Sequence, residues 1–159
     1  MDIYSVLQDL GISYEEYKHP AVYTVKESDR LDLKIPGGRS KNLFLRNRAG
    51  DRHILVTAEA SSLINLKTLA EELGEKKLIF ASPERLKKYL GVEPGSVSPF
   101  NLIFDTERDV EIVIDKKLLE EERIGFHPNT NTATLVISSQ DLKKFVCGLG
   151  YEPRTASLV

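Results

Sequence analysis

Apolar residues recur along this chain with two different periods, one typical of helices and one typical of strands. Between residues 2 and 10 the apolar side chains share one helical face, so we expect a short amphipathic helix that ends at Gly11. Helical spacing, capping residues and closing glycines predict further helices over residues 24–33, 65–73 and 82–90, a short helix after Asp115, and a last helix that begins at Ser138 or Ser139.

Short apolar runs between these helices predict strands over residues 13–18, 41–46, 52–57, 77–80, 102–104, 110–114 and 135–137. A hairpin turn over residues 47–51 joins two of them, and His53 alternates with Leu55, which indicates a surface position on its strand. Strands and helices are mixed without the regular alternation of a doubly wound sheet. We therefore predict an α/β fold, a single domain over residues 1–159 with a mixed β-sheet flanked by helices.

The charge balance limits how the chain can bind nucleic acid. The formal net charge is -2 over 159 residues, so a polyanion would have to be held by a local patch. Residues 26–48 carry such a basic excess, with seven Lys and Arg side chains against three acidic ones. This stretch suits a phosphodiester backbone, or it is a scattered solvated surface.

Several classes of chemistry find no support in the sequence. Cys147 is the single cysteine; its place in an apolar helical pattern indicates a buried small residue, with a catalytic thiol as the lesser alternative. No His/Cys set has zinc spacing and no glycine-rich phosphate loop is present, so we expect no metal and no cofactor. No apolar run approaches the ~20 residues of a membrane span, and the N-terminus lacks a secretion signal, so a cytoplasmic protein is expected.

A polar stretch between an acidic helix and an apolar strand is the first candidate site. Gly125 can bring the backbone close to a ligand, Phe126 and His127 follow it, and Pro128 fixes the next turn. The Asn-Thr-Asn-Thr run over residues 129–132 adds amide and hydroxyl groups. Such a rim suits a small polar ligand or a developing oxyanion, although the same sequence also fits an ordinary loop.

The second candidate site is the start of the strand at residues 41–46. Lys41 is either a solubilising charge at a strand edge or a fixed cation for a phosphate or carboxylate at the mouth of a pocket. Asn42 beside it offers both a hydrogen-bond donor and an acceptor. A third segment, residues 91–100, holds two glycines and two prolines in ten residues and is therefore predicted to be a shaped loop.

These segments occur in a fixed order: Ser40-Lys41-Asn42-Leu43-Phe44-Leu45, then the loop at residues 91–99, then Gly125-Phe126-His127-Pro128 with Asn129-Thr130-Asn131-Thr132-Ala133. Each is weak alone, but together they resemble the YbaK/prolyl-tRNA synthetase editing-domain family over nearly the whole chain. Asn rather than Thr after Lys41 is most similar to the freestanding branch that deacylates Ala-tRNA(Pro).

This resemblance implies a trans-editing hydrolase, an ester hydrolase that clears tRNA(Pro) mischarged with an amino acid smaller than proline. Water would attack the ester carbonyl, assisted by the 2′-hydroxyl of the terminal ribose, without a metal, a cofactor or a protein nucleophile. The implied partners are aminoacylated tRNA(Pro) and prolyl-tRNA synthetase, with no DNA and no membrane.

The resemblance also implies roles for residues of this chain. Lys41 would hold the terminal phosphate or ribose, and Gly125 with the backbone after it would line the oxyanion position. His127 would shape the pocket and orient the substrate. The substrate-binding candidates are Asn42, Ser98, Phe126, Pro128, Tyr23 and Thr24, and the tRNA-binding candidates are Lys26, Arg30, Arg39 and Arg46.

Two alternatives remain at the level of the sequence. The same reaction could act on Cys-tRNA(Pro) or on another small aminoacyl-tRNA, which a comparison of esters of different size would decide. A non-catalytic module could instead sense charged tRNA or a free amino acid. The presence of both Lys41 and the segment at residues 125–128 favours the enzyme.

Overall fold

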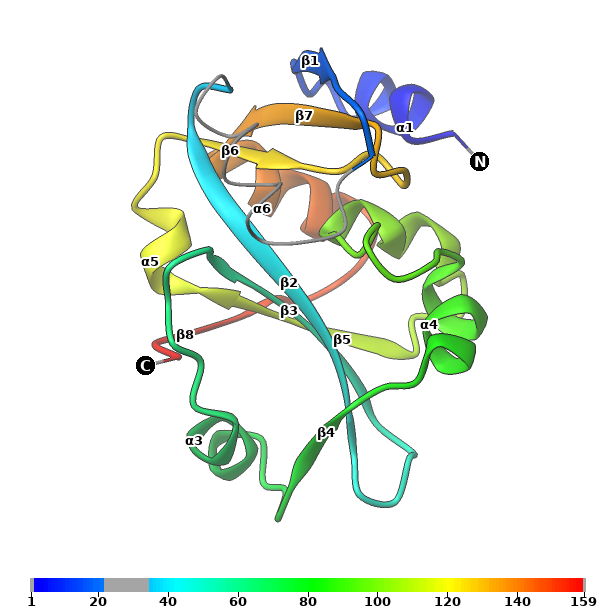
Figure 1. The fold of residues 1–159 in the computed structure, drawn as a ribbon, viewed down its shortest axis with the longest axis vertical. Helices are drawn as coiled ribbons and strands as arrows, with labels where there is room; N and C mark the ends of the chain where they lie inside the picture. Colours follow the sequence, from blue (N-terminus) through cyan, green and yellow to red (C-terminus); the bar gives the residue numbers. More distant parts are fainter. Residues whose placement is uncertain (1, 22–34, 159) are drawn as a thin grey trace.

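A computed structural model describes residues 2–21 and 35–158 of the chain (Figure 1). The helix expected over residues 24–33 lies outside these residues, and so do four candidate site residues, Tyr23, Thr24, Lys26 and Arg30. The other expected helices are confirmed: α1 Ile3–Asp9, α3 Leu66–Glu72, α4 Pro83–Leu90, α5 Lys116–Leu119 and α6 Ser139–Gly148.

Capping residues explain where the helices begin and end. The side chains of Asn65, Ser82, Asp115 and Ser138 each accept a hydrogen bond from a backbone N–H in the first turn of the helix that follows. α4 ends at Gly91, which has a left-handed φ of 71° that a residue with a side chain adopts only at a cost.

One mixed sheet of eight strands forms the centre of the molecule (Figure 1). The strand order is β1-β7-β6-β2-β3-β5-β8, with β4 paired to β2. The pairs β2–β6, β3–β5 and β5–β8 are parallel, and the other pairs are antiparallel. The strands are β1 Glu15–Lys18, β2 Gly38–Asn47, β3 His53–Glu59, β4 Leu78–Phe80, β5 Val110–Asp115, β6 Arg123–Phe126, β7 Ala133–Ser138 and β8 Arg154–Ala156.

This sheet, flanked by helices, confirms the α/β fold expected from the sequence, with two corrections to its elements. Residues 102–104 were expected to form a strand but belong to a 3-10 helix, η1 Pro99–Phe104. Ser98 and Asn101 form a capping box at its start, so a helix-start signal overrides the apolar run. β8 was not expected, because its three residues become a strand through pairing with β5 rather than through a pattern of their own.

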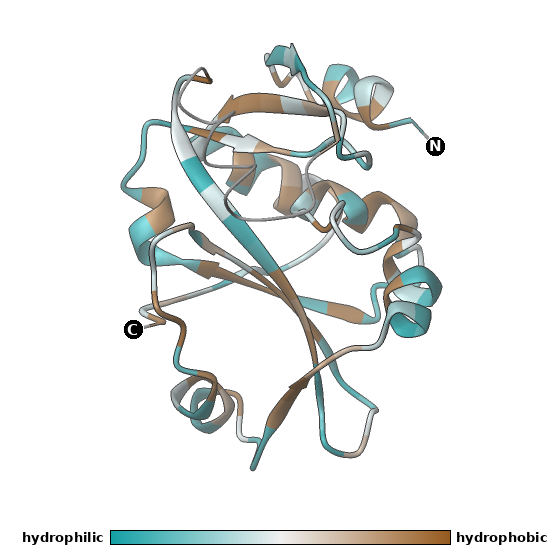
Figure 2. Ribbon diagram, in the orientation of Figure 1, coloured by the Kyte–Doolittle hydropathy of each residue, from teal (hydrophilic) through white to brown (hydrophobic). Residues whose placement is uncertain are grey.

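A hydrophobic core lies on each face of the sheet. On one face Phe44 and Leu55 pack with residues of α1, η1 and α6, and on the other Leu45 and Ile54 pack with residues of α3. Along β2, Figure 2 shows hydrophilic residues in the first half, followed by a hydrophobic stretch. This stretch is Leu43-Phe44-Leu45, and Arg46 and Asn47 end the strand, so the first half of β2 is a polar segment beside a short apolar one.

Cys147 is exposed on α6, which contradicts the expected burial. The inward face of this helix is formed by Leu142, Phe145 and Val146, and the residue after Val146 turns toward solvent.

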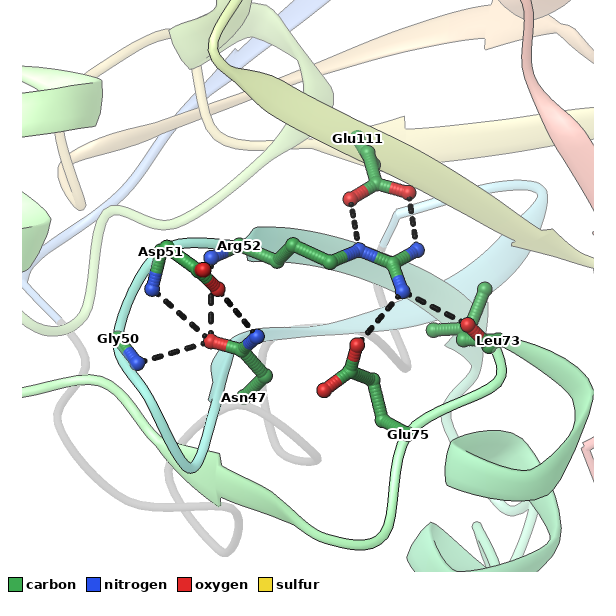
Figure 3. Close-up of polar contacts among 7 residues, drawn as sticks. All are labelled: Asn47, Gly50, Asp51, Arg52, Leu73, Glu75 and Glu111. Atoms are coloured by element: carbon green, nitrogen blue, oxygen red, sulfur yellow. Dashed lines mark hydrogen bonds and ion pairs between the residues drawn. The ribbon is translucent and has the colours of Figure 1, made fainter.

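Arg52 ties β3 to β5 and to the end of α3 (Figure 3). Its guanidinium donates two hydrogen bonds to the Glu111 carboxylate, at 2.8 and 2.7 Å, and further ones to Glu75 and to the Leu73 carbonyl. On the other strand of the hairpin, the Asn47 side-chain oxygen accepts from three consecutive backbone N–H groups of the turn. These contacts fix the hairpin that joins β2 to β3.

His53 is buried, with 2% of its surface exposed, so the expected surface position is wrong. Its ring lies between Phe44 and Tyr89, with centroid distances of 5.7 and 4.0 Å. The Arg85 guanidinium lies 2.9 Å from Nε2, and because Arg can only donate, this nitrogen accepts and the ring is neutral. Burial, followed by the positive charge of Arg85, lowers the pKa of His53.

Stability should therefore fall in mild acid. A folded-state pKa below the unfolded value of about 6.5 means that the unfolded chain binds more protons, so the free energy of unfolding decreases as the pH falls through that value. Besides Arg85, the positive charges of Arg46 and Lys88 act in the same direction, and Asp109 opposes them.

We expect the thermal unfolding midpoint to drop between about pH 7.5 and pH 5.5, and His53→Phe to remove part of that drop. Differential scanning fluorimetry across this range measures both proteins. Equal pH slopes for the wild type and the variant would show that His53 is not the titrating group.

Candidate active site

A small cavity lies where β2 and β6 separate. The two strands pair only at Gly38 with Ile124 and at Arg39 with Gly125, after which β2 continues along β3. The cavity has a volume of about 50 Å³. It is lined by Ile35, Pro36, Gly37, Gly38, Arg39, Ser40, Asn42, Gly125, Phe126, His127 and Thr134.

Gly125 is required by the close approach of β7 to this wall. A Cβ on residue 125 would lie 2.9 Å from the Thr134 methyl group, closer than packed carbon atoms approach one another. The Gly125 carbonyl also accepts a hydrogen bond from the Ser40 hydroxyl at 2.9 Å, which joins β6 to β2 at the cavity.

His127 is oriented by hydrogen bonds on both its ring and its backbone. Its Nδ1 lies 3.0 Å from the Ala133 carbonyl oxygen, and since a carbonyl can only accept, Nδ1 carries the proton. This hydrogen bond fixes the orientation of the imidazole ring. The His127 carbonyl accepts from the Ser98 hydroxyl at 2.9 Å, so η1 holds the turn that carries the imidazole.

Ser98 and Asn101 form a fully buried polar pair behind this turn. The Asn101 side chain accepts from the Ser98 backbone N–H at 2.8 Å and donates to the Asn129 side chain at 2.7 Å. Asn129 has a φ of 64°, and this bond supports the left-handed residue in the turn. The loop before η1 thus positions His127 from outside the cavity.

A second imidazole lies beside the first. The rings of His19 and His127 are 5.9 Å apart in an edge-to-face arrangement, and His19 Nε2 is 2.9 Å from the hydroxyl of Thr134, which lines the cavity. From the sequence alone, His19 was assigned no role in the site. The available signal was that His19-Pro20 repeats the His-Pro dipeptide of His127-Pro128.

Lys41 and Asn42 lie on opposite faces of β2, because neighbouring side chains of a strand point in opposite directions. Asn42 lines the cavity. The Lys41 ammonium donates to the backbone carbonyl of Ser62, whose hydroxyl donates to the buried Asp115 carboxylate at 3.1 Å. Lys41 is therefore close to the cavity in sequence but does not line it.

The structure brings together some of the candidates and separates others. Among the expected site residues, the cavity is lined by Arg39, Asn42, Gly125, Phe126 and His127. Ser98 supports the His127 turn, and Pro128 is buried without lining the cavity. Arg46 lies at the other end of β2, where its guanidinium donates to the carbonyls of Asn47 and Arg48.

The parts of the chain that the structure describes hold no group of three or more His, Cys, Asp or Glu side chains placed to bind a metal ion. Among the helices within residues 2–21 and 35–158, none has the length and apolarity needed to span a membrane.

Known proteins are similar to this chain in sequence and in fold. The aminoacyl-tRNA editing domain matches residues 19–145. The chain is 44% identical over 140 residues to the prolyl-tRNA editing protein ProX of Acetoanaerobium sticklandii, covering 88% of this chain and 85% of the relative. It is 37% identical over 151 residues to prolyl-tRNA synthetase associated domain-containing protein 1 of Bos taurus, covering 92% and 88%.

A crystal structure described as a candidate trans-editing enzyme for prolyl tRNA synthetase superposes with a TM-score of 0.75 over 98% of this chain and 93% of the other. The two sequences are 18% identical, so this likeness shows a shared fold.

The close contact at Gly125 gives a test of the cavity wall. Gly125→Ala should lower the free energy of unfolding by about 1–3 kcal/mol, because the added methyl overlaps the Thr134 methyl. Adding Thr134→Ser, which removes that methyl and keeps the hydroxyl for His19, should restore part of the loss. Chemical denaturation of the two single variants and the double variant measures the coupling, and strictly additive effects would contradict the contact.

Proposed function

The chain belongs to the aminoacyl-tRNA editing domain family, and from this premise we propose that it deacylates mischarged Ala-tRNA(Pro) in trans. Membership makes it an aminoacyl-tRNA deacylase, a hydrolase. The relative named a prolyl-tRNA editing protein supports tRNA(Pro) as the tRNA. One observation carries the proposal: every residue that lines the cavity falls within the matched span of residues 19–145.

The chemistry requires little from the protein beyond positioning. An aminoacyl ester is already activated, so water can attack its carbonyl carbon while the bond to the ribose oxygen breaks and that oxygen takes up a proton. Holding the reactants in place can lower such a barrier by ~7–11 kcal/mol. We assign to the terminal ribose 2′-hydroxyl the role of orienting the water, which agrees with a site built from backbone, amide and imidazole groups.

Within the cavity, the proposal gives Gly125 and His127 the positions closest to the reacting ester. Gly125 lets the backbone approach the carbonyl because no side chain stands in the way, and the backbone that follows lines the oxyanion position. The ring of His127 is held in place by its hydrogen bond to the Ala133 carbonyl, which suits the orientation of a hydroxyl or a water molecule.

Selection for a small amino acid follows from the size of the cavity. The cavity is small, so a methyl side chain would fit it more readily than a pyrrolidine ring. A rigid wall that excludes the ring sterically discriminates more strongly than a roomy pocket, where an extra methylene is worth only ~1–3 kcal/mol. Phe126 and the buried Pro128 supply rigid apolar surface at and beside this wall.

We assign to Lys41 a contact with the tRNA, made outside the cavity. Its ammonium lies on the opposite face of β2, so we propose that it binds the terminal phosphate or ribose after exchanging its contact with Ser62 for the ligand. Arg39, which lines the cavity, would contact the same end of the tRNA. The name of the Bos taurus relative also supports prolyl-tRNA synthetase as a partner.

The first test is hydrolysis of labelled Ala-tRNA(Pro) and Pro-tRNA(Pro). We expect rapid loss of alanine only. His127→Ala should lower kcat/KM by about 100-fold, as loss of a transition-state contact does, and Lys41→Ala by about 10-fold or more. The exposed Lys143→Ala, on α6 and outside the basic stretch at residues 26–48, is the control and should be unchanged.

Other outcomes separate the alternatives. Cleavage of Cys-tRNA(Pro) without Ala-tRNA(Pro) would change the substrate but not the reaction. Tight binding of charged tRNA without turnover would indicate a sensing module. Wild-type rates in both site variants would overturn the assignment of Lys41 and His127.

tRNA affinity should fall as salt increases, because phosphate contacts release counterions. Arg39→Ala should reduce the slope of log affinity against log salt by about 1. Arg46→Ala removes the same charge at the far end of β2, where the guanidinium is held by two carbonyls, and we expect a smaller change. Filter binding of tRNA(Pro) across salt concentrations measures the slopes, and a flat response in the wild type would remove the basic patch from the interface.

A further inference from the structure

Two buried oxygen atoms near the cavity have no hydrogen-bond partner among the described residues: Asn42 Oδ1 and Thr57 Oγ1. They belong to residues that face each other directly in the β2–β3 pair. Directly opposite residues project from the same face of a sheet, with Cβ atoms about 4.5–5.5 Å apart. Asn42 and Thr57 therefore project from the same face of the sheet, and each carries an oxygen without a hydrogen-bond partner.

This pair points to the side of the sheet on which the cavity lies. Asn42 lines the cavity, and Thr57, directly opposite it on β3, is fully buried. Along the two strands the neighbours on this face, Phe44 and Leu55, belong to the hydrophobic core. A hydroxyl and a carboxamide oxygen without partners in such surroundings lose the hydrogen bonds that water would give them.

Three backbone carbonyls around the cavity already accept a hydrogen bond. The carbonyl of Gly125 accepts from Ser40, that of His127 accepts from Ser98, and that of Ala133 accepts from the His127 ring. Asn42 Oδ1 is thus a buried acceptor at the cavity that still lacks a donor. An aminoacyl ester carries a strong donor close to its reacting carbonyl, the α-ammonium group.

We propose that Asn42 and Thr57 form the subsite that recognises the α-ammonium group of the aminoacyl ester. Asn42 Oδ1 accepts one N–H of the ammonium. Thr57 is a positioning residue: in the ligand-bound protein its hydroxyl donates to the second lone pair of the same oxygen, a bond that is absent without ligand, and holds the carboxamide toward the ligand. This inference rests on the proposed deacylase function and adds to it the residue pair that distinguishes an amino acid from other acyl groups.

The experiment compares two esters that differ only at this group: Ala-tRNA(Pro) and propionyl-tRNA(Pro), which has a hydrogen atom in place of the ammonium and so no donor there. Thr57→Val removes the hydroxyl and keeps the shape of the side chain, and Thr57→Ser keeps the hydroxyl. We expect Thr57→Val to lower kcat/KM for the alanyl ester about 10-fold, to leave the propionyl ester unchanged, and Thr57→Ser to behave as the wild type on both.

Thermal unfolding provides a second readout with a distinctive sign. Because the Thr57 hydroxyl is unpaired in the ligand-free protein, Thr57→Val should unfold at the same temperature as the wild type or higher. A lower unfolding temperature, or an equal loss on both esters, would make the hydroxyl structural and overturn the proposal. A wild-type protein that cleaves neither ester would instead overturn the deacylase function itself, and this subsite with it.

Discussion

β2 belongs to two halves of one sheet, and the rest of the structure depends on that shared strand. At its start it pairs with β6 over two residues, from Ser40 to Arg46 it pairs with β3, and at its end it pairs with β4. After Arg39, β2 no longer pairs with β6 and continues along β3. The cavity lies beside the first half of β2, where its pairing with β6 ends, so the site follows from the geometry of strand pairing.

The walls of this gap are held by polar contacts placed behind them. Ser40 fastens β2 to β6, and Ser98 fastens η1 to the His127 turn. Asn101 in turn supports the turn at Asn129. Ser98 and Asn101 are buried and hydrogen-bonded, which keeps the cost of their burial low and the turn rigid. Rigidity matters for a site whose proposed selectivity is steric and whose proposed catalysis relies on positioning.

Side chains alternate between the two faces of β2, so neighbouring residues have different surroundings. Asn42 reaches the cavity, whereas Lys41, one residue earlier, contacts the Ser62 loop on the opposite face. The side chains of the Lys41-Asn42 dipeptide, one motif in the sequence, therefore lie in two different environments. One of them suits an aminoacyl group and the other a charged part of the tRNA, so the two side chains can be tested separately.

The sequence by itself determined the class of fold, the helix ends and the candidate segments, because capping residues, closing glycines and side-chain periods act over a few neighbouring positions. It also pointed to Gly125 and His127. The tertiary structure decided what depends on distant partners: the burial of His53 between two aromatic rings, the strand β8, the pairing of Asn42 with Thr57, and the nearness of His19 to His127. Local patterns cannot contain these results, since each arises when separate strands, helices or turns are brought into contact or register.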